Sequence, residues 1–228
     1  MFLLKNKGLK LIFYCLIAYI ILCVPVSLIL IQFTKVKLIW NLILAFIPLP
    51  FALLFQKSAE THRKKKGILF GLLWLLFFPN APYIITDFIH ISGIRFYSFA
   101  ADETATYSTD ILAWLNLAYI GTGVILGVLM GFYSLYVIHK TIIRYRSKRL
   151  ANIVVVGSGL LCGYAIYLGR IPRLNSWDFL NPIYFLTKLY QSIGLFPLLY
   201  SLIFACFVLF GYFLFYVMVD TENKDSRT

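Results

Sequence analysis

Four residues in one short stretch have the types and spacing of a polar site. Asn80, Tyr83, Asp87 and His90 occur in FFPNAPYIITDFIH, residues 77–90, where most other residues are apolar. They are three, four and three residues apart, which places them on one face of a helix. A carboxylate one turn away from an imidazole could serve as an acid and base pair or hold a ligand. The stretch therefore predicts a polar stripe that faces a partner or a water-filled cavity.

A second polar segment, GRIPRLNSWDFLNP at 169–182, could meet this stripe. Its candidate site residues are Arg170, Arg173, Asn175, Trp177 and Asp178. A planar guanidinium matches a carboxylate through two hydrogen bonds, so we expect Asp87 to pair with Arg170 or Arg173. Two interpretations stay open: an internal salt-bridge and hydrogen-bond lattice, or a ligand or catalytic site open to the outside.

Metal and nucleophilic chemistry have less support. Asp87 and His90 with Asp178 or Asp110 would form a carboxylate-rich metal shell, but the chain has no HExxH motif and no second outer histidine at ligand spacing. His90 could activate a nearby serine, but no GxSxG elbow is present. All four cysteines fall in apolar runs without a CxxC pair. We therefore expect no metal and no cofactor.

The composition indicates a membrane protein. The chain is 61% hydrophobic and 13% charged, against roughly 25% charged residues in an ordinary soluble domain, and its mean hydropathy is +0.84. Six apolar runs are each long enough for a helix to cross about 30 Å of hydrocarbon. They predict an all-α integral membrane bundle of about six transmembrane helices, in a single domain over 1–219 with a polar tail at 220–228. The predicted helices are 11–33, 38–55, 68–91, 111–138, 151–169 and 192–219.

Prolines interrupt the third predicted helix. Pro79 and Pro82 lack an amide hydrogen, and each ring would crowd the preceding turn of a continuous helix. Asn80 is a favoured N-cap residue, so we expect a break near 79–80 and a second half-helix over 81–91. A half-helix that begins near the bilayer midplane presents free amides and a positive dipole end, as in several transporters. The alternative is a simple proline kink satisfied by neighbouring helices.

Basic residues predict the orientation of the bundle. Of the 21 Lys and Arg residues, 15 fall on one side of the predicted spans and 6 on the other. The positive-inside rule then predicts a multi-pass cell-membrane protein with both termini in the cytoplasm. The basic runs at 62–66 and 144–149 serve as orientation signals, with an anionic-lipid or RNA patch as the alternative; no nucleic-acid partner is expected. His62 and His139, which fall in the predicted inner loops, are expected to be solvated.

Glycines spaced four residues apart predict close helix packing. Gly123, Gly127 and Gly131 form such a ridge in the fourth span, and Gly159 and Gly163 another in the fifth. Small residues at this spacing let two helix backbones approach closely in a membrane. The contacts are expected within the chain or between protomers of a homo-oligomer.

Residues 77–90 and 173–178 resemble a family of bacterial polytopic membrane proteins that is known only as a domain of unknown function. The family's hallmark is a PNAPY-I-TD core ending in histidine, followed by an N-S-W-D element. The matching residues are Pro79, Asn80, Ala81, Pro82, Tyr83, Thr86, Asp87 and His90, then Asn175, Ser176, Trp177 and Asp178. The resemblance begins near the second helix and implies a bacterial cell-membrane protein of several helices. It implies no activity.

Three functions stay open, each with membrane lipids as partners. The first is transport or binding of an unknown small molecule or lipid head group at the broken helix. The second is an enzyme that acts on a lipid or cell-envelope precursor at the outer face, with Asp87 and His90 as acid and base. Arg170 or Arg173 would then hold an anionic head group. The third is a non-catalytic assembly partner. Few polar residues besides Asn41 and Gln56 lie where a transporter's inner path would run, which weakens transport.

Overall fold

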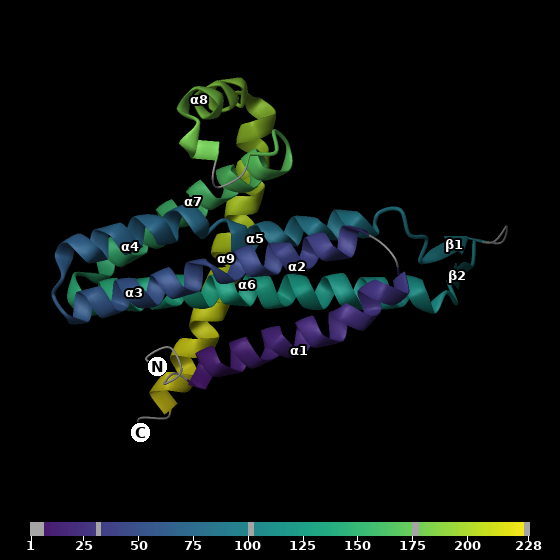
Figure 1. The fold of residues 1–228 in the computed structure, drawn as a ribbon, viewed down its shortest axis with the longest axis horizontal. Coiled ribbons are helices and arrows are strands. Elements are labelled where there is room, and N and C mark those ends of the chain that lie inside the picture. Colours follow the sequence, from purple (N-terminus) through teal and green to yellow (C-terminus); the bar gives the residue numbers. More distant parts are fainter. Residues whose placement is uncertain (1–6, 31–32, 100–102, 175–177, 226–228) are drawn as a thin grey trace.

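The chain folds into a bundle of long apolar α-helices, with one small β hairpin (Figure 1). The computed structural model describes residues 7–30, 33–99, 103–174 and 178–225. Within these ranges, five helices are long and apolar enough to cross a membrane: 38–60, 64–91, 111–145, 148–170 and 195–220. The predicted all-α membrane bundle is confirmed.

The helices and strands follow one another along the chain in this order. They are α1 (Lys7–Leu30), α2 (Phe33–Phe46), α3 (Pro48–Glu60), α4 (Lys64–Phe77), α5 (Asn80–Tyr83), the 3₁₀-helix η2 (Ile84–Ile91), β1 (Tyr97–Phe99), β2 (Ala105–Tyr107), α6 (Ile111–Tyr145), α7 (Lys148–Arg170), the 3₁₀-helix η3 (Asp178–Leu180), α8 (Pro182–Gln191) and α9 (Leu195–Asp225). The strands pair antiparallel, with Ser98 opposite Thr106.

Several predicted boundaries differ from the structure. The fourth span continues beyond 138 to Tyr145, and α7 begins at Lys148, so the predicted loop at 139–150 is only a short turn. Ser147 ends this turn by accepting a hydrogen bond from the Leu150 amide, an N-cap that starts α7 at once. The predicted outer loop at 170–191 contains α8, whose cap is Asn181. In the first span, α1 extends over Lys7–Leu30, close to the predicted 11–33.

The two ends of the bundle differ. The turn between α3 and α4 and the turn between α6 and α7 lie at one end, and the β hairpin lies at the other (Figure 1). The first end carries the basic runs at 62–66 and 144–149. Helix α8, which lies between α7 and α9, is placed away from both of these ends (Figure 1).

His139 is buried, so the expectation that it is solvated is wrong. Because α6 extends through this position, the ring lies inside the bundle with 7% of its surface exposed. Its Nδ1 lies 2.8 Å from the Tyr212 hydroxyl and its Nε2 lies 3.1 Å from Asn152 Oδ1. The imidazole thus joins α6 to α7 and α9 by hydrogen bonds. His62 is exposed, as expected.

The glycine ridges pack inside the chain. A Cβ atom at Gly127 would lie 2.8 Å from the Ile84 side chain, and one at Gly131 would lie 2.8 Å from Ala81. Because real Cβ atoms essentially never come this close, only glycine lets α6 approach α5 and η2 so closely. Gly163 is likewise covered by the α9 backbone at Ser201. The ridge on α6 therefore holds the segment with the candidate polar stripe in place.

Candidate functional site

The helix at Pro79 is kinked rather than unwound. The backbone stays right-handed helical at Phe78 and Pro79. The Phe78 carbonyl accepts from the Ala81 amide at 3.2 Å, and the Pro79 carbonyl accepts from the Tyr83 amide at 2.9 Å. The first of these bonds satisfies the carbonyl that Pro82, which has no amide hydrogen, leaves without its usual donor, and the second is an ordinary helical bond. Of the two predicted forms of the interruption, the proline kink describes it.

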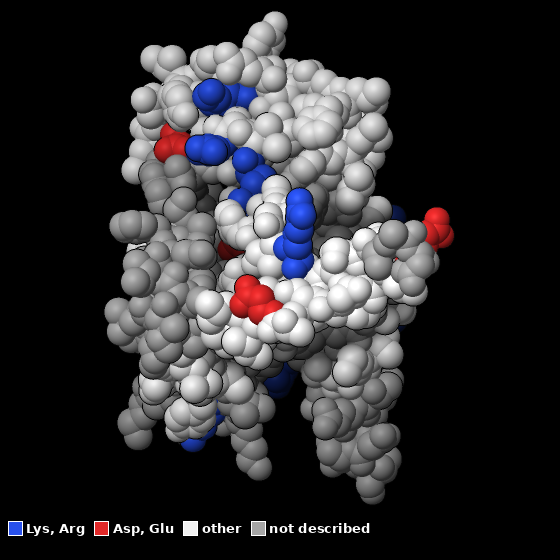
Figure 2. Space-filling model, turned by 90° about the vertical axis from the view of Figure 1, so that its right-hand side faces the viewer, with Lys and Arg blue, Asp and Glu red and all other residues white. Residues whose placement is uncertain are grey.

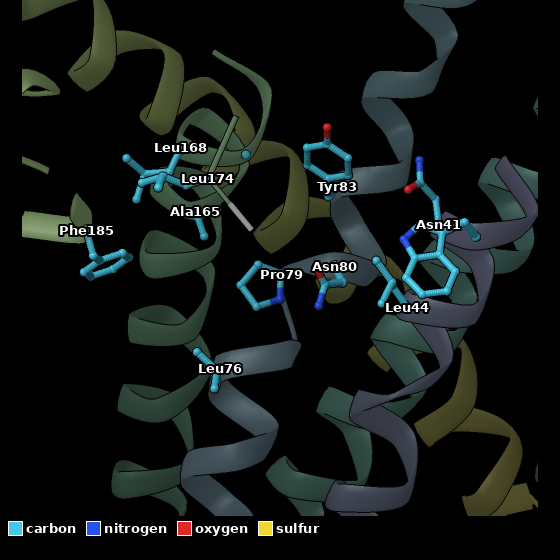
Figure 3. Close-up of a pocket in the computed structure, with 12 residues that line it drawn as sticks. Asn41, Leu44, Leu76, Pro79, Asn80, Tyr83, Ala165, Leu168, Leu174 and Phe185 are labelled. Carbon is cyan, nitrogen blue, oxygen red and sulfur yellow. The ribbon is translucent and has the colours of Figure 1, made fainter. Parts of the chain in front are cut away.

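The predicted N-cap at Asn80 is wrong. Pro79 occupies the N-cap position of α5, and no side chain in the described part of the chain caps it. Asn80 is already helical, because the backbone before it never leaves the helical region, and its side chain is turned toward a cavity instead (Figure 3). The half-helix predicted for 81–91 is a 3₁₀-helix from Ile84 onward. With three residues per turn, Asp87 and His90 lie one above the other.

Asp87 is the most buried member of the predicted stripe, with 3% of its surface exposed. Its Oδ1 accepts from Arg170 Nη2 at 2.9 Å, and its Oδ2 accepts from Asn41 Nδ2 at 2.7 Å. His90 Nε2 is 3.8 Å from Oδ1, beyond hydrogen-bond distance. Both carboxylate oxygens thus have a donor, and Arg170 is the one of the two expected arginines that pairs with Asp87.

Arg170 is held on three sides. Its Nε donates to Thr86 Oγ1 at 2.9 Å, and the Thr86 hydroxyl donates to the Tyr83 carbonyl at 2.7 Å. The guanidinium carbon lies 4.8 Å from the centre of the Tyr83 ring, within range of a cation–π interaction. Arg170 is also the last residue of α7, where the helix dipole favours a positive charge. Tyr83, Thr86 and Asp87 therefore fix one arginine.

Neither Asn41 nor Thr86 is among the residues that the sequence predicts for the site. Asn41 is a lone amide in the apolar stretch LIWNLIL of α2. A single polar side chain in such a stretch needs a partner, and this was the feature that could have pointed to its role. Asn41 was counted instead with the few polar residues of a possible transport path. Thr86 precedes Asp87 in the family-like core, where its hydroxyl could have been recognised as a partner.

Of the remaining predicted residues, His90 lies beside the ion pair, with its Nε2 3.8 Å from Asp87 Oδ1. Arg173 is exposed and has a positive φ of 61°. The His90 side chain is 34% exposed. Asp178 begins η3, while Asn175 and Trp177 lie outside the described residues.

Asp110 takes no part in the site. It caps α6 by accepting from the Leu112 amide at 2.9 Å. Among the described residues, no group of three or more His, Cys, Asp or Glu side chains could hold a metal ion.

A cavity of about 270 Å³ lies beside the ion pair, at the kink. Figure 3 shows Asn41 and Leu44 of α2 on one side, Leu168 and Leu174 on the other, and Pro79 and Asn80 at the kink. The lining is mostly apolar, and its polar side chains belong to Asn41, Asn80 and Tyr83. The full lining is Trp40, Asn41, Leu44, Leu76, Pro79, Asn80, Tyr83, Ala165, Leu168, Gly169, Leu174 and Phe185.

Figure 2 shows both basic and acidic side chains on the face of the molecule at the hairpin end. The buried pair of Asp87 and Arg170 adds no net charge.

These features define a multi-pass helical membrane protein with a buried ion pair and an adjacent cavity at a kinked helix. The chain belongs to the family described as "Protein of unknown function (DUF1361)", whose model matches residues 40–217. The match begins within α2, so α1 lies outside it. The resemblance to a family of unknown function is thus confirmed. No curated protein and no solved structure matches the chain.

Proposed function

We propose that this protein binds a small amphipathic molecule in the cavity at the kink. The observation that supports this most strongly is the cavity itself, which three polar side chains line at one place in an otherwise apolar wall. Ligand sites commonly combine an apolar lining with a few placed polar groups. A volume of about 270 Å³ corresponds to roughly nine water molecules at about 30 Å³ each. This suits a small ligand or the head of a larger one.

The chemistry of the lining favours an uncharged polar group. Asn41, Asn80 and Tyr83 offer amides and a phenol, which bind hydroxyl, amide or sugar groups. The nearest charges, Asp87 and Arg170, are already paired with each other. An added charge would have to compete with this pair or stay unpaired at high cost. The apolar part of the ligand would lie against Leu168 and its neighbours.

The geometry supports binding better than acid–base catalysis. Asp87 accepts from both Arg170 and Asn41, so each of its carboxylate oxygens already has a donor within the protein. His90 is beyond hydrogen-bond distance of Asp87, so the two do not form an oriented pair. In this proposal Asp87 fixes Asn41, which lines the cavity, through a hydrogen bond and takes no part in a reaction.

We further propose that the cavity belongs to the outer half of a cell-membrane protein whose termini are both cytoplasmic. The basic runs at 62–66 and 144–149 lie at one end of the bundle (Figure 1), and such an end is retained in the cytoplasm. Helix α7 starts at that end, and the cavity is lined by its last turns, at Ala165 and Leu168.

The test compares what the full chain retains when the cavity is filled. Wild-type protein, Ala165→Phe and Leu161→Phe are purified gently in a mild detergent. Bound molecules are weighed by native mass spectrometry and identified after extraction by chromatography and mass spectrometry. Ala165 lines the cavity, whereas Leu161 lies on the same helix with 56% of its surface exposed. We expect wild type and Leu161→Phe to carry the same amphipathic molecule and Ala165→Phe to lose it.

Thermal unfolding of each protein in the same detergent serves as the control for folding. The proposal is wrong if Ala165→Phe retains the molecule at the wild-type level. It is also wrong if wild-type protein carries no molecule besides bulk lipid, a result that would favour an assembly role.

A further inference from the structure

A second cavity, at the opposite end of the bundle from the hairpin, has the form of a lipid site. Its volume is about 470 Å³, larger than the cavity at the kink. It lies between the end of α3, the start of α4, and the turn that joins α6 to α7. The site at the kink uses none of its lining residues.

The cavity has an apolar wall and a basic rim. Ile68, Leu72 and Ile142 contribute to the wall, and Arg63, Lys64 and Arg146 contribute to the rim. Ile68 and Leu72 also face outward, with 65% and 62% of their surfaces exposed, so the wall continues along the outside of α4. A head group at the rim could therefore extend its chain along a surface that lies in the bilayer.

The charge around this cavity has one sign. Among the described residues at 57–66 and 144–149, nine are Lys or Arg and one, Glu60, is acidic. Glu60 accepts a hydrogen bond from Gln56 at 3.0 Å. Basic residues at a membrane surface attract anionic lipids, each by about 1 kcal/mol. The rim of the cavity thus lacks an internal counter-charge of matching size.

The start of α4 also has an excess of positive charge that an anion would balance. Its first turn holds Lys64, Lys65 and Lys66, and no acidic residue. Positive charge at a helix N-terminus is opposed by the helix dipole, so this arrangement destabilises the helix on its own. Lysines that served only to orient the protein in the membrane would work equally well outside the helix, and that role would not account for a cavity beside them. An anion at the rim would relieve the repulsion.

We propose that this cavity binds one anionic phospholipid, with its phosphate at Arg63, Lys64 and Arg146 and an acyl chain along Ile68 and Leu72. Gly67 lines the cavity and, without a side chain, leaves its space open. A Cβ atom there would meet only Ser58, at 3.8 Å, so a longer side chain could enter the cavity without a backbone clash. This site is separate from the proposed function and does not depend on it.

The test measures retention of a defined lipid by the full chain. Purified protein is titrated with palmitoyl-oleoyl phosphatidylglycerol or phosphatidylcholine in mild detergent, and the bound fraction is read by native mass spectrometry. The test variant is Arg63→Gln with Arg146→Gln. The matched control is Lys65→Gln with Lys66→Gln, which removes the same charge at exposed positions that do not line the cavity.

We expect one phosphatidylglycerol to bind wild type in preference to phosphatidylcholine. The test variant should weaken this binding by roughly 10- to 30-fold, since each lost charge is worth about 1 kcal/mol. The control should change it by no more than about twofold, because Lys65 and Lys66 do not line the cavity and water screens their charges from a phosphate bound at the rim. Gly67→Leu keeps every charge but fills part of the cavity, so it should also lose the lipid. This variant tests the proposal if the arginine variant does not fold.

Three results would overturn the proposal. Equal losses in the test and control variants would mean that diffuse charge alone attracts the lipid. Equal retention of phosphatidylcholine would mean that the rim does not recognise an anion. Displacement of the lipid by millimolar inorganic phosphate would mean that the rim is a site for free anions.

Discussion

Arg170 Nη2 lies 2.9 Å from Asp87 Oδ1 and so joins the end of α7 to η2, beyond the kink. The two residues are 83 positions apart in the chain. Their side chains are 19% and 4% exposed, so the pair is largely shielded from water. Such a pair contributes little net stability over apolar residues of similar size, but it is costly to break from one side.

Asp87→Asn should therefore destabilise the protein by about 3–5 kcal/mol, because it leaves the Arg170 charge without its partner. Unfolding in a mild detergent against increasing denaturing detergent gives the measurement. The double change Asp87→Leu with Arg170→Met should recover more than half of the loss. An additive result for the double variant would show that the two residues do not act as a pair.

Gly163→Ala should destabilise the contact between α7 and α9 by about 1–3 kcal/mol, the usual cost of forcing an extra group into a packed site. The new methyl group would meet the Ser201 carbonyl and the Ala205 amide and side chain. Gly157→Ala in the same helix is the control, since nothing lies within 4 Å of its Cβ position. That variant should be neutral or stabilised by up to about 1 kcal/mol. Thermal midpoints of the two variants, measured side by side, should move apart.

The hydrogen bond between His139 and Tyr212 should also be measurable. Asn152 Oδ1 accepts from His139 Nε2, so Nδ1 of the neutral ring accepts from the Tyr212 hydroxyl. Tyr212→Phe removes this donor and should cost about 1–2 kcal/mol in the free energy of unfolding. Tyr190→Phe, at a residue that is 78% exposed, should have no effect. Equal midpoints for wild type and Tyr212→Phe would contradict the bond.

Apolar run length and proline chemistry predicted the bundle and the kink, because each depends on local sequence. The spans at 68–91 and 151–169 lie close to helices that the structure contains. The predicted fourth span ended too early, at 138, because the basic residues that follow were assigned to a loop. No glycine or proline interrupts 138–145, so α6 continues to Tyr145, and the N-cap at Ser147 sets the start of α7.

The candidate site was only partly predictable for a related reason. Asp87 and its arginine were recognisable because a carboxylate in an apolar span needs a cation. Asn41 was assigned elsewhere because its role depends on how α2 packs against η2, a contact between distant segments. The cavity itself depends on the packing of five elements, which no single motif describes.

The two roles of Tyr83 can be separated by two substitutions. Its ring lies against the Arg170 guanidinium, and the same residue lines the cavity at the kink. Tyr83→Phe keeps the ring, so the free energy of unfolding should change by less than about 1 kcal/mol while the bound molecule is retained less well. Tyr83→Leu removes the ring and should lower stability by a further 0.5–2 kcal/mol, roughly the range for a cation–π contact. Both variants are measured for unfolding and for bound molecules in the same preparation. If Tyr83→Phe leaves the bound fraction unchanged, the phenol does not contact the ligand, and the polar part of the molecule must be held by Asn41 and Asn80.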